Sequence, residues 1–267
     1  MATTKKKTTG KTGGRTESKA ERASVSNTPE KFTGFRPAAL TFLRGLARNN
    51  KREWFEANRS RYETEVKRPL QVLVEEIDAR LGEIAPEMVG NPKRSIFRIY
   101  RDVRFSKDKS PYKTNAAAWF YHRDAGHAVG TAAVHGGAGF YFQIAPGECI
   151  VAGGIWMPPA AALKTLRETI ADDYEELRSI LRQPAFKRAF GALSDEAVLK
   201  RTPRAFDPEH PAADLLRYKS FTVSRELSEA DMSNAKLPDM IAKQYATMLP
   251  FVRWLNRVLG LPPHSRR

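Results

Sequence analysis

The densest group of side chains with a capacity for chemistry lies between residues 93 and 113. Eight lysines and arginines stand there against two aspartates, Asp102 and Asp108, and the cations are interleaved with apolar residues. Guanidinium groups bind phosphate or carboxylate through paired hydrogen bonds, and an aspartate between arginines orients them. The segment therefore predicts an anion-binding site. The residues expected to form it are Arg98, Arg101, Asp102, Arg104, Lys107, Lys109, Tyr112 and Lys113.

The alternation of charged and apolar residues predicts a β-strand over 95–105. Alternate residues of a strand share a face, which places Arg98, Tyr100, Asp102 and Arg104 on one side. In this arrangement the arginines contact the anion, Asp102 orients them, and the lysines supply long-range attraction. An edge strand protected from aggregation by its charges explains the same pattern without any ligand.

A second polar group lies later in the chain and includes His210, Asp214 and Lys219. It comes directly before another predicted strand, which starts near Phe221. If that strand joins the same sheet as 95–105, this group reaches the anion site. We therefore include His210 and Lys219 among the candidate ligand-binding residues, with ordinary surface roles as the alternative.

Other reactive residue types occur in patterns that match no known catalytic or metal site. His122, Asp124, His127 and His135 lie close together in the sequence, but their spacing fits no known ligand pattern. Cys149 lies within a predicted strand without a nearby histidine, which favours a buried and inert thiol. The sequence predicts no metal ion and no cofactor, and it leaves open whether the protein is an enzyme.

The composition is that of a basic chain with enough apolar residues for a sizeable core. The 267 residues carry a formal net charge of +15, and 41% of them are hydrophobic. A single cysteine excludes an internal disulfide, and no apolar run approaches the roughly 18 residues of a membrane-spanning helix. These features predict a soluble, cytoplasmic protein with no membrane partner.

The first 31 residues are basic and nearly devoid of large apolar side chains. Eight basic residues stand there against three acidic ones, and only Met1 and Val25 are large and apolar. Such a segment cannot bury enough surface to offset the entropy of ordering, so we predict a disordered basic tail over 1–31. A polycationic tail is attracted to phosphate backbones, although the same composition also serves solubility alone.

Helical and strand patterns follow one another in the order helices, strands, helices. Apolar residues at helical spacing predict helices over 37–47, 50–66, 70–81, 163–181 and 240–259. Strand patterns besides 95–105 cover 115–122, 139–145 and 148–157. This order predicts an α+β fold, with an antiparallel sheet in the middle of the chain packed against N-terminal and C-terminal helices. We expect one domain over 32–261 and a disordered C-terminal tail over 262–267.

Two local signals refine the N-terminal helices. Asn50, followed by Glu53 three residues later, resembles a capping box and predicts that a helix starts there. Pro69 marks either a new start or a kink within the helical region.

The most specific motif of the chain is Arg-Asp-x-Arg-Phe-Ser followed by Asp-Lys-x-Pro-Tyr-Lys, at residues 101–113. Together with Asn49-Asn50, Trp54-Phe55 and the later Leu-Leu-x-Tyr-Lys at 215–219, it resembles a family known only as a domain of unknown function, number twenty-four sixty-one. The resemblance covers roughly residues 32–260. It implies one intact domain and supplies no established activity.

These observations lead to one principal hypothesis and two alternatives. The principal hypothesis is a basic pocket that binds a small phosphate-bearing or carboxylate ligand. The first alternative is a nucleic-acid-associated protein, in which the basic tail and the basic strand follow the phosphate backbone. The second is an enzyme that acts on a phosphorylated or acyl substrate, which no nucleophile and base in the sequence support.

Overall fold

A computed structural model describes residues 30–104, 106–128 and 136–263. The chain divides into two units, Met1–Glu30 and Lys31–Arg267, and the following account concerns the second. The predicted basic tail lies almost wholly outside the described residues, as do Phe105, His135 and the last four residues. No helix of the described part is both long and apolar enough to cross a membrane.

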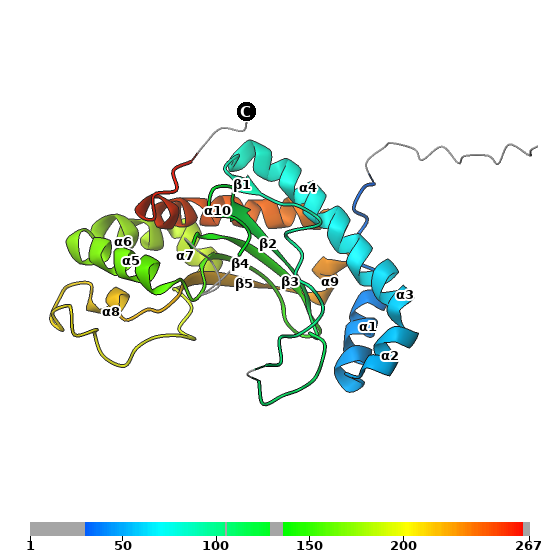
Figure 1. Cartoon of the computed structure of the whole chain (residues 1–267). Coiled ribbons are helices and arrows are strands. Elements are labelled where there is room, and N and C mark those ends of the chain that lie inside the picture. Colours follow the sequence, from blue (N-terminus) through cyan, green and yellow to red (C-terminus); the bar gives the residue numbers. More distant parts are fainter. Residues whose placement is uncertain (1–29, 105, 129–135, 264–267) are drawn as a thin grey trace, which may run out of the picture. The chain divides into compact units, whose positions relative to one another are not determined.

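A five-stranded antiparallel sheet stands in the middle of the chain, with helices before and after it (Figure 1). The order of the strands in the sheet follows their order in the chain, so each strand pairs with the next. This architecture confirms the predicted α+β fold. The strands are β1 (Met88–Val89), β2 (Ala116–His122), β3 (Gly139–Ile144), β4 (Cys149–Ile155) and β5 (Phe221–Leu227).

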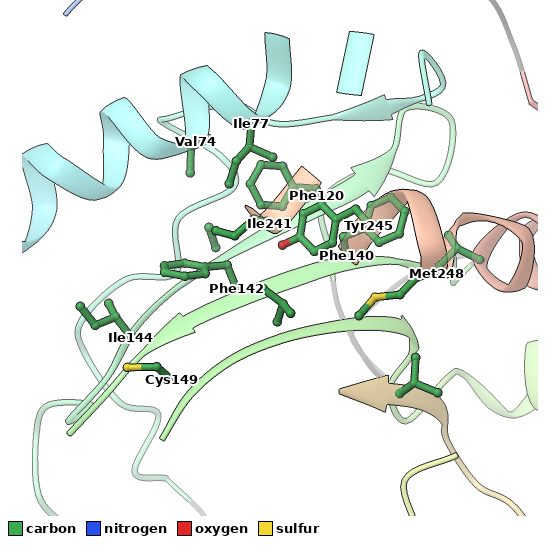
Figure 2. Close-up of a cluster of buried hydrophobic side chains, with 14 of the residues drawn as sticks. Val74, Ile77, Phe120, Phe140, Phe142, Ile144, Cys149, Ile241, Tyr245 and Met248 are labelled. Carbon is green, nitrogen blue, oxygen red and sulfur yellow. The ribbon is translucent and has the colours of Figure 1, made fainter. Parts of the chain in front are cut away.

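One face of the sheet is covered by two long helices, α4 (Arg68–Ile84) and α10 (Leu237–Val258). Phe140 of β3 stacks on Tyr245 of α10, with ring centroids 4.5 Å apart (Figure 2). Gly153 of β4 permits the close approach of α10, since a Cβ atom there would lie 2.7 Å from the sulfur of Met248. The fully buried aromatic and aliphatic side chains between these layers form the core. Burial of their apolar surface supplies the main stabilisation of the fold.

The N-terminal helices form largely as the sequence predicts, with one local difference. The elements are α1 (Pro37–Arg48), α2 (Arg52–Ala57), α3 (Arg59–Arg61) and a π-helical segment η1 (Tyr62–Lys67) that leads directly into α4. The capping box predicted at Asn50 is not formed, because the N-cap residue of α2 is Lys51. The Asn50 amide instead exchanges two hydrogen bonds with the backbone of Tyr112, which fixes the N-terminal helices to a distant segment.

The C-terminal half contains more and shorter helices than the apolar pattern predicts. The single helix expected over 163–181 is divided at Asp173, whose extended backbone (φ −148°, ψ 93°) ends one helix before the next begins. The helices there are α5 (Ala160–Asp172), α6 (Glu175–Arg182), α7 (Pro184–Phe190), α8 (Ala213–Leu216) and α9 (Glu229–Met232). The late strand predicted near Phe221 is present as β5 and joins the sheet beside β4.

The strand predicted over 95–105 is absent from the described part of that segment. The backbone there forms only two isolated bridges, between Ile96 and Ala118 and between Tyr100 and Tyr112. Three residues separate Ile96 from Tyr100, whereas five separate Tyr112 from Ala118, so one side of the pair carries two extra residues. Such a bulge interrupts the ladder, and the expected row of charged residues on one face is lost with it.

Candidate functional site

The face of the sheet opposite α10 forms the floor of a cleft of about 890 Å³. Successive residues of a strand point to opposite faces, and Phe120, Phe140 and Phe142 point towards α10 (Figure 2). Their neighbours Trp119 and Tyr141 therefore point the other way, into the cleft. The residues of the sheet that line the cleft are Ala117, Trp119, Tyr141, Gln143, Ile150, Ala152, Gly153, Gly154, Thr222, Val223 and Ser224.

Two irregular segments form the walls, and each is fastened to an outer part of the sheet. The first wall contains Phe97, whose backbone N–H donates to the carbonyl of Ala117 in β2. The second contains Ser194, whose backbone N–H donates to the carbonyl of Thr222 in β5. Further residues of the rim come from the strand ends and the walls, namely Arg98, Asp102, Lys113, Asn115, Glu148, Trp156 and Glu196.

A hydrogen-bonded amide holds the polar part of the floor in place. The Oε1 atom of Gln143 accepts from the Asn115 amide at 2.6 Å and from the Tyr141 hydroxyl at 2.8 Å. Its Nε2 atom donates to the carbonyl of Glu148 at 3.1 Å. Burial, with a smaller effect of the Glu148 charge, raises the pKa of Tyr141 to about 12, so the phenol keeps its proton and remains a donor.

Arg98 and Lys113 bring two positive charges to the first wall. The Lys113 ammonium lies 5.0 Å from the centroid of the Phe97 ring, within cation–π range. Burial, and secondarily the charge of Arg98, lowers the pKa of Lys113. Neither the Arg98 guanidinium nor the Lys113 ammonium forms a hydrogen bond or an ion pair with another described residue. Both cations are therefore available to a ligand in the cleft.

Comparison with known protein families shows the family to which this chain belongs. Residues 38–254 match the model of a family described as "Conserved hypothetical protein (DUF2461)". The chain belongs to this family. The DUF2461 match contains every residue that lines the cleft and confirms the resemblance inferred from the motifs. No curated protein and no solved structure gave a match in the other two comparisons.

Four other charged residues of the segment 101–113 pair with one another. The Arg101 guanidinium forms an ion pair with Asp108, and Arg104 binds Asp102 through two nitrogens. The hydrogen bond from Arg104 lowers the pKa of Asp102 to about 2, and bonds from Ser110 and then Arg101 lower that of Asp108. These carboxylates stay ionised at neutral pH, as the surrounding cations lead one to expect.

The remaining predicted site residues lie outside the lining of the cleft. Tyr112 is buried and stacks on Phe55, with ring centroids 4.2 Å apart. Lys109 donates from Nζ to the carbonyl of Val103, and Lys107 is exposed to solvent. Of the eight residues proposed from 98–113, the structure brings Arg98, Asp102 and Lys113 to the cleft.

The second polar group, which includes His210 and Lys219, does not line the cleft. This holds even though β5 joins the sheet, which was the condition for that group to reach the anion site. His210 accepts at Nδ1 from the backbone N–H of Ala212, and its Nε2 lies 3.0 Å from the carbonyl of Ala171. The backbone thus engages both ring nitrogens. Lys219 is exposed, and its backbone N–H donates to Ala197, which follows the cleft residue Glu196.

The reactive residues outside the cleft have structural surroundings. Within residues 30–104, 106–128 and 136–263, no group of three or more His, Cys, Asp or Glu side chains is placed to hold a metal ion. Cys149 is buried and donates to the carbonyl of Ala145, and burial raises the pKa of its thiol. This agrees with the inert thiol expected from the sequence.

The aromatic and amide floor was not anticipated, although the sequence contains a signal for it. An antiparallel sheet with one solvated face usually carries polar or charged residues there. At the corresponding positions β2 and β3 instead carry Ala117, Trp119, Tyr121, Tyr141 and Gln143. Ala117, Trp119, Tyr121 and Gln143 are almost completely buried, so the absence of charge at these positions indicates that other segments cover much of this face.

Proposed function

We propose that this protein binds a small ligand through a phosphate or carboxylate group, which Arg98 and Lys113 contact in the cleft over the sheet. The observation that carries the proposal is the position of these two cations. Both line a concave surface, and neither forms an ion pair with a carboxylate of the described chain, although, after the hydrogen bond from Arg104, the charge of Arg98 contributes to the lowered pKa of Asp102. Of the other arginines of the motif, Arg101 pairs with Asp108 outside the lining, and Arg104 pairs with Asp102, which lies in the lining.

The surroundings of the two cations strengthen their attraction for an anion. Lys113 is partly buried beside Phe97, where solvent screens its charge less than at an open surface. A bound anion would offset the desolvation that lowers the pKa of this lysine. The Arg98 guanidinium adds a planar fork suited to paired hydrogen bonds with phosphate or carboxylate. Hydrogen bonds to a charged group contribute about 1.5–3 kcal/mol each.

The proposal is tested by calorimetric titration of the full chain with inorganic phosphate and with succinate. We expect Arg98→Ala and Lys113→Ala each to weaken binding about tenfold or more, because each variant removes one charge-assisted contact. Arg94→Ala is the matched control, since Arg94 is an exposed cation of the same segment outside the cleft lining. Circular dichroism verifies that each variant folds.

The outcome also locates the anion along the segment. Arg104→Ala removes an exposed arginine that lies outside the cleft lining but pairs with Asp102, and we expect it to weaken binding less than Arg98→Ala does. If Arg104→Ala abolishes binding while Arg98→Ala and Lys113→Ala bind like the wild type, the site lies on the outer part of the motif and the cleft proposal is wrong.

A further inference from the structure

Trp156 directly follows β4, and its large aromatic side chain is unusually exposed at the cleft. Its side chain is 54% exposed, one of two large apolar side chains that are exposed in the described part of the chain, the other being Tyr100. Trp156 lines the cleft, whereas Tyr100 does not. An indole that faces both water and a concave site is available to stack on a flat or ring-shaped ligand.

The backbone around Trp156 adopts conformations that its neighbours must hold in place. Met157 has a φ of +44°, which a residue with a side chain seldom adopts. Its N–H donates to the hydroxyl of the buried Ser220 at 2.9 Å. Gly154 has a φ of +125°, and a Cβ atom there would lie 2.0 Å from the carbonyl oxygen of Phe221. Contacts with the start of β5 thus fix the backbone on both sides of Trp156, which favours a defined position for the residue that carries the indole.

The groups around this platform match the chemistry of a sugar. Trp119 and Tyr141 add two further aromatic side chains to the floor, and Ile150 is the largest aliphatic residue of the lining. Hydroxyl, amide and carboxylate groups are distributed along the whole cleft. A sugar ring has apolar C–H faces that stack on aromatic rings, and its hydroxyls pair with such polar groups. Thr222 pairs with Gly154, two residues before Trp156, and Ser194 donates its backbone N–H to the carbonyl of Thr222; Glu196 follows in the same wall.

The balance of charge limits how acidic the ligand is. Asp102 is already paired with Arg104, which leaves Glu148 and Glu196 in the lining against Arg98 and Lys113. A polyphosphate would meet two carboxylates as well as two cations. A ligand with one acidic group and otherwise neutral hydroxyls suits both kinds of charge. Its acidic group pairs with the two cations, and its hydroxyls donate hydrogen bonds to the two carboxylates.

The two walls set the length of the ligand. The cations stand on the wall fastened to β2, and Glu196 belongs to the wall fastened to β5. Three strand intervals separate β2 from β5, which amounts to about 14 Å at the usual strand spacing. A ligand that contacts both walls is therefore longer than one sugar ring.

We infer that the ligand is an acidic oligosaccharide, whose single acidic group binds Arg98 and Lys113 and whose further sugar ring stacks on Trp156. This inference rests on the proposed function, because the same two cations hold the acidic group. A uronic acid and a sugar phosphate both supply that group.

The test compares matched acidic and neutral disaccharides by calorimetric titration of the full chain. Cellobiouronic acid is paired with cellobiose, and trehalose 6-phosphate with trehalose, which distinguishes a carboxylate from a phosphate as the acidic group. Glucuronic acid, inorganic phosphate and adenosine monophosphate serve as further probes. We expect at least one acidic disaccharide to bind about tenfold more tightly than glucuronic acid and inorganic phosphate, since one aromatic contact contributes roughly that factor.

Trp156 variants report on the sugar contact separately from the anion contact. Trp156→Ala is expected to weaken binding of the acidic disaccharide about tenfold while leaving the affinity for inorganic phosphate unchanged. Trp156→Phe retains a stacking ring and restores most of the affinity. Tyr100→Ala, the control, removes the exposed aromatic side chain outside the cleft and leaves both affinities unchanged.

Failure of the inference and failure of the proposed function give different results. If inorganic phosphate binds in an Arg98-dependent manner but neither acidic disaccharide binds more tightly, or Trp156→Ala has no effect on them, the carbohydrate inference is overturned and the anion site stands. Tighter binding of adenosine monophosphate than of both acidic disaccharides also overturns it, in favour of a nucleotide. If neutral and acidic disaccharides bind equally and Arg98→Ala changes neither, the anion proposal is wrong.

Discussion

The two faces of the central sheet use the same strands for opposite purposes. Towards α10, β3 presents Phe140 and Phe142, which are fully buried. Towards the cleft, the alternate residues are Tyr141 and Gln143, which are joined by a hydrogen bond at 2.8 Å. One face supplies apolar burial, and the other holds polar groups in a fixed arrangement beside an open cleft. Neighbouring residues of one strand thus have different surroundings, and if the proposed function holds, substitutions on one face should affect stability and substitutions on the other face should affect binding.

The largest expected effect comes from the α10 face. Phe140→Ala removes a ring that stacks on Tyr245 and leaves a cavity, which typically lowers the free energy of unfolding by about 3–5 kcal/mol. Urea unfolding followed by circular dichroism measures the change. If the alanine variant does not fold, Phe140→Leu gives a smaller loss in the same direction. A loss below about 1 kcal/mol for alanine would show that this face is not the stabilising one.

The second effect is a pH dependence confined to the cleft face. The pKa of Lys113 lies below the ordinary value of 10.5, so its charge is complete at low pH and is lost as the pH rises through that lowered value. Affinity for succinate should therefore begin to fall at a lower pH than it would if Lys113 titrated like an ordinary lysine. Losing the charged contact costs about 1.5–3 kcal/mol of binding free energy.

Lys113→Arg provides the matched control for this pH dependence. An arginine keeps its charge throughout the range, so the decline in succinate affinity should disappear. Succinate is the suitable probe because its carboxylates are already ionised above neutral pH. An unchanged decline in the arginine variant would assign the pH dependence to another group.

The smallest effect is expected from Tyr141, directly beside Phe140 in the chain. Tyr141→Phe keeps the ring and removes one hydrogen bond to Gln143, whose Oε1 still accepts from Asn115. The loss in unfolding free energy should be about 0.5–1.5 kcal/mol, measured by the same urea titration. A loss as large as that of Phe140→Ala would contradict the contrast between the two faces.

The regular elements could be predicted well from the sequence because local patterns determine them. The hairpin of β3 and β4 follows from its strand residues and the intervening Pro146-Gly147, and the core stripe of α4 follows from helical spacing. Asn50 shows where this reasoning ends. Its side chain is a good helix cap by type, but it binds the backbone of Tyr112, which is 62 residues away, and no local pattern reveals such a partner.

The candidate site could be predicted only in part, for the same reason. Charge density directed attention to 98–113, and Arg98 and Lys113 of this segment line the cleft, whereas their role in binding stays a prediction. The pairing of Arg101 with Asp108 depends on an irregular loop that periodicity cannot describe. The opposite wall with Glu196 lies in a connection without regular structure, so its approach to the first wall depends entirely on the tertiary fold.

The connections between the strands also determine when the cleft comes into being during folding. Residues 145–148 join β3 to β4, whereas residues 156–220 separate β4 from β5. Closing the longer loop costs about 2.5 kcal/mol more chain entropy, so we expect β5 to pair after the hairpin has formed. Ser194 and Glu196 belong to this long loop. The complete cleft is thus expected to form only after the hairpin, and a ligand that bridges both walls would stabilise the pairing of β5.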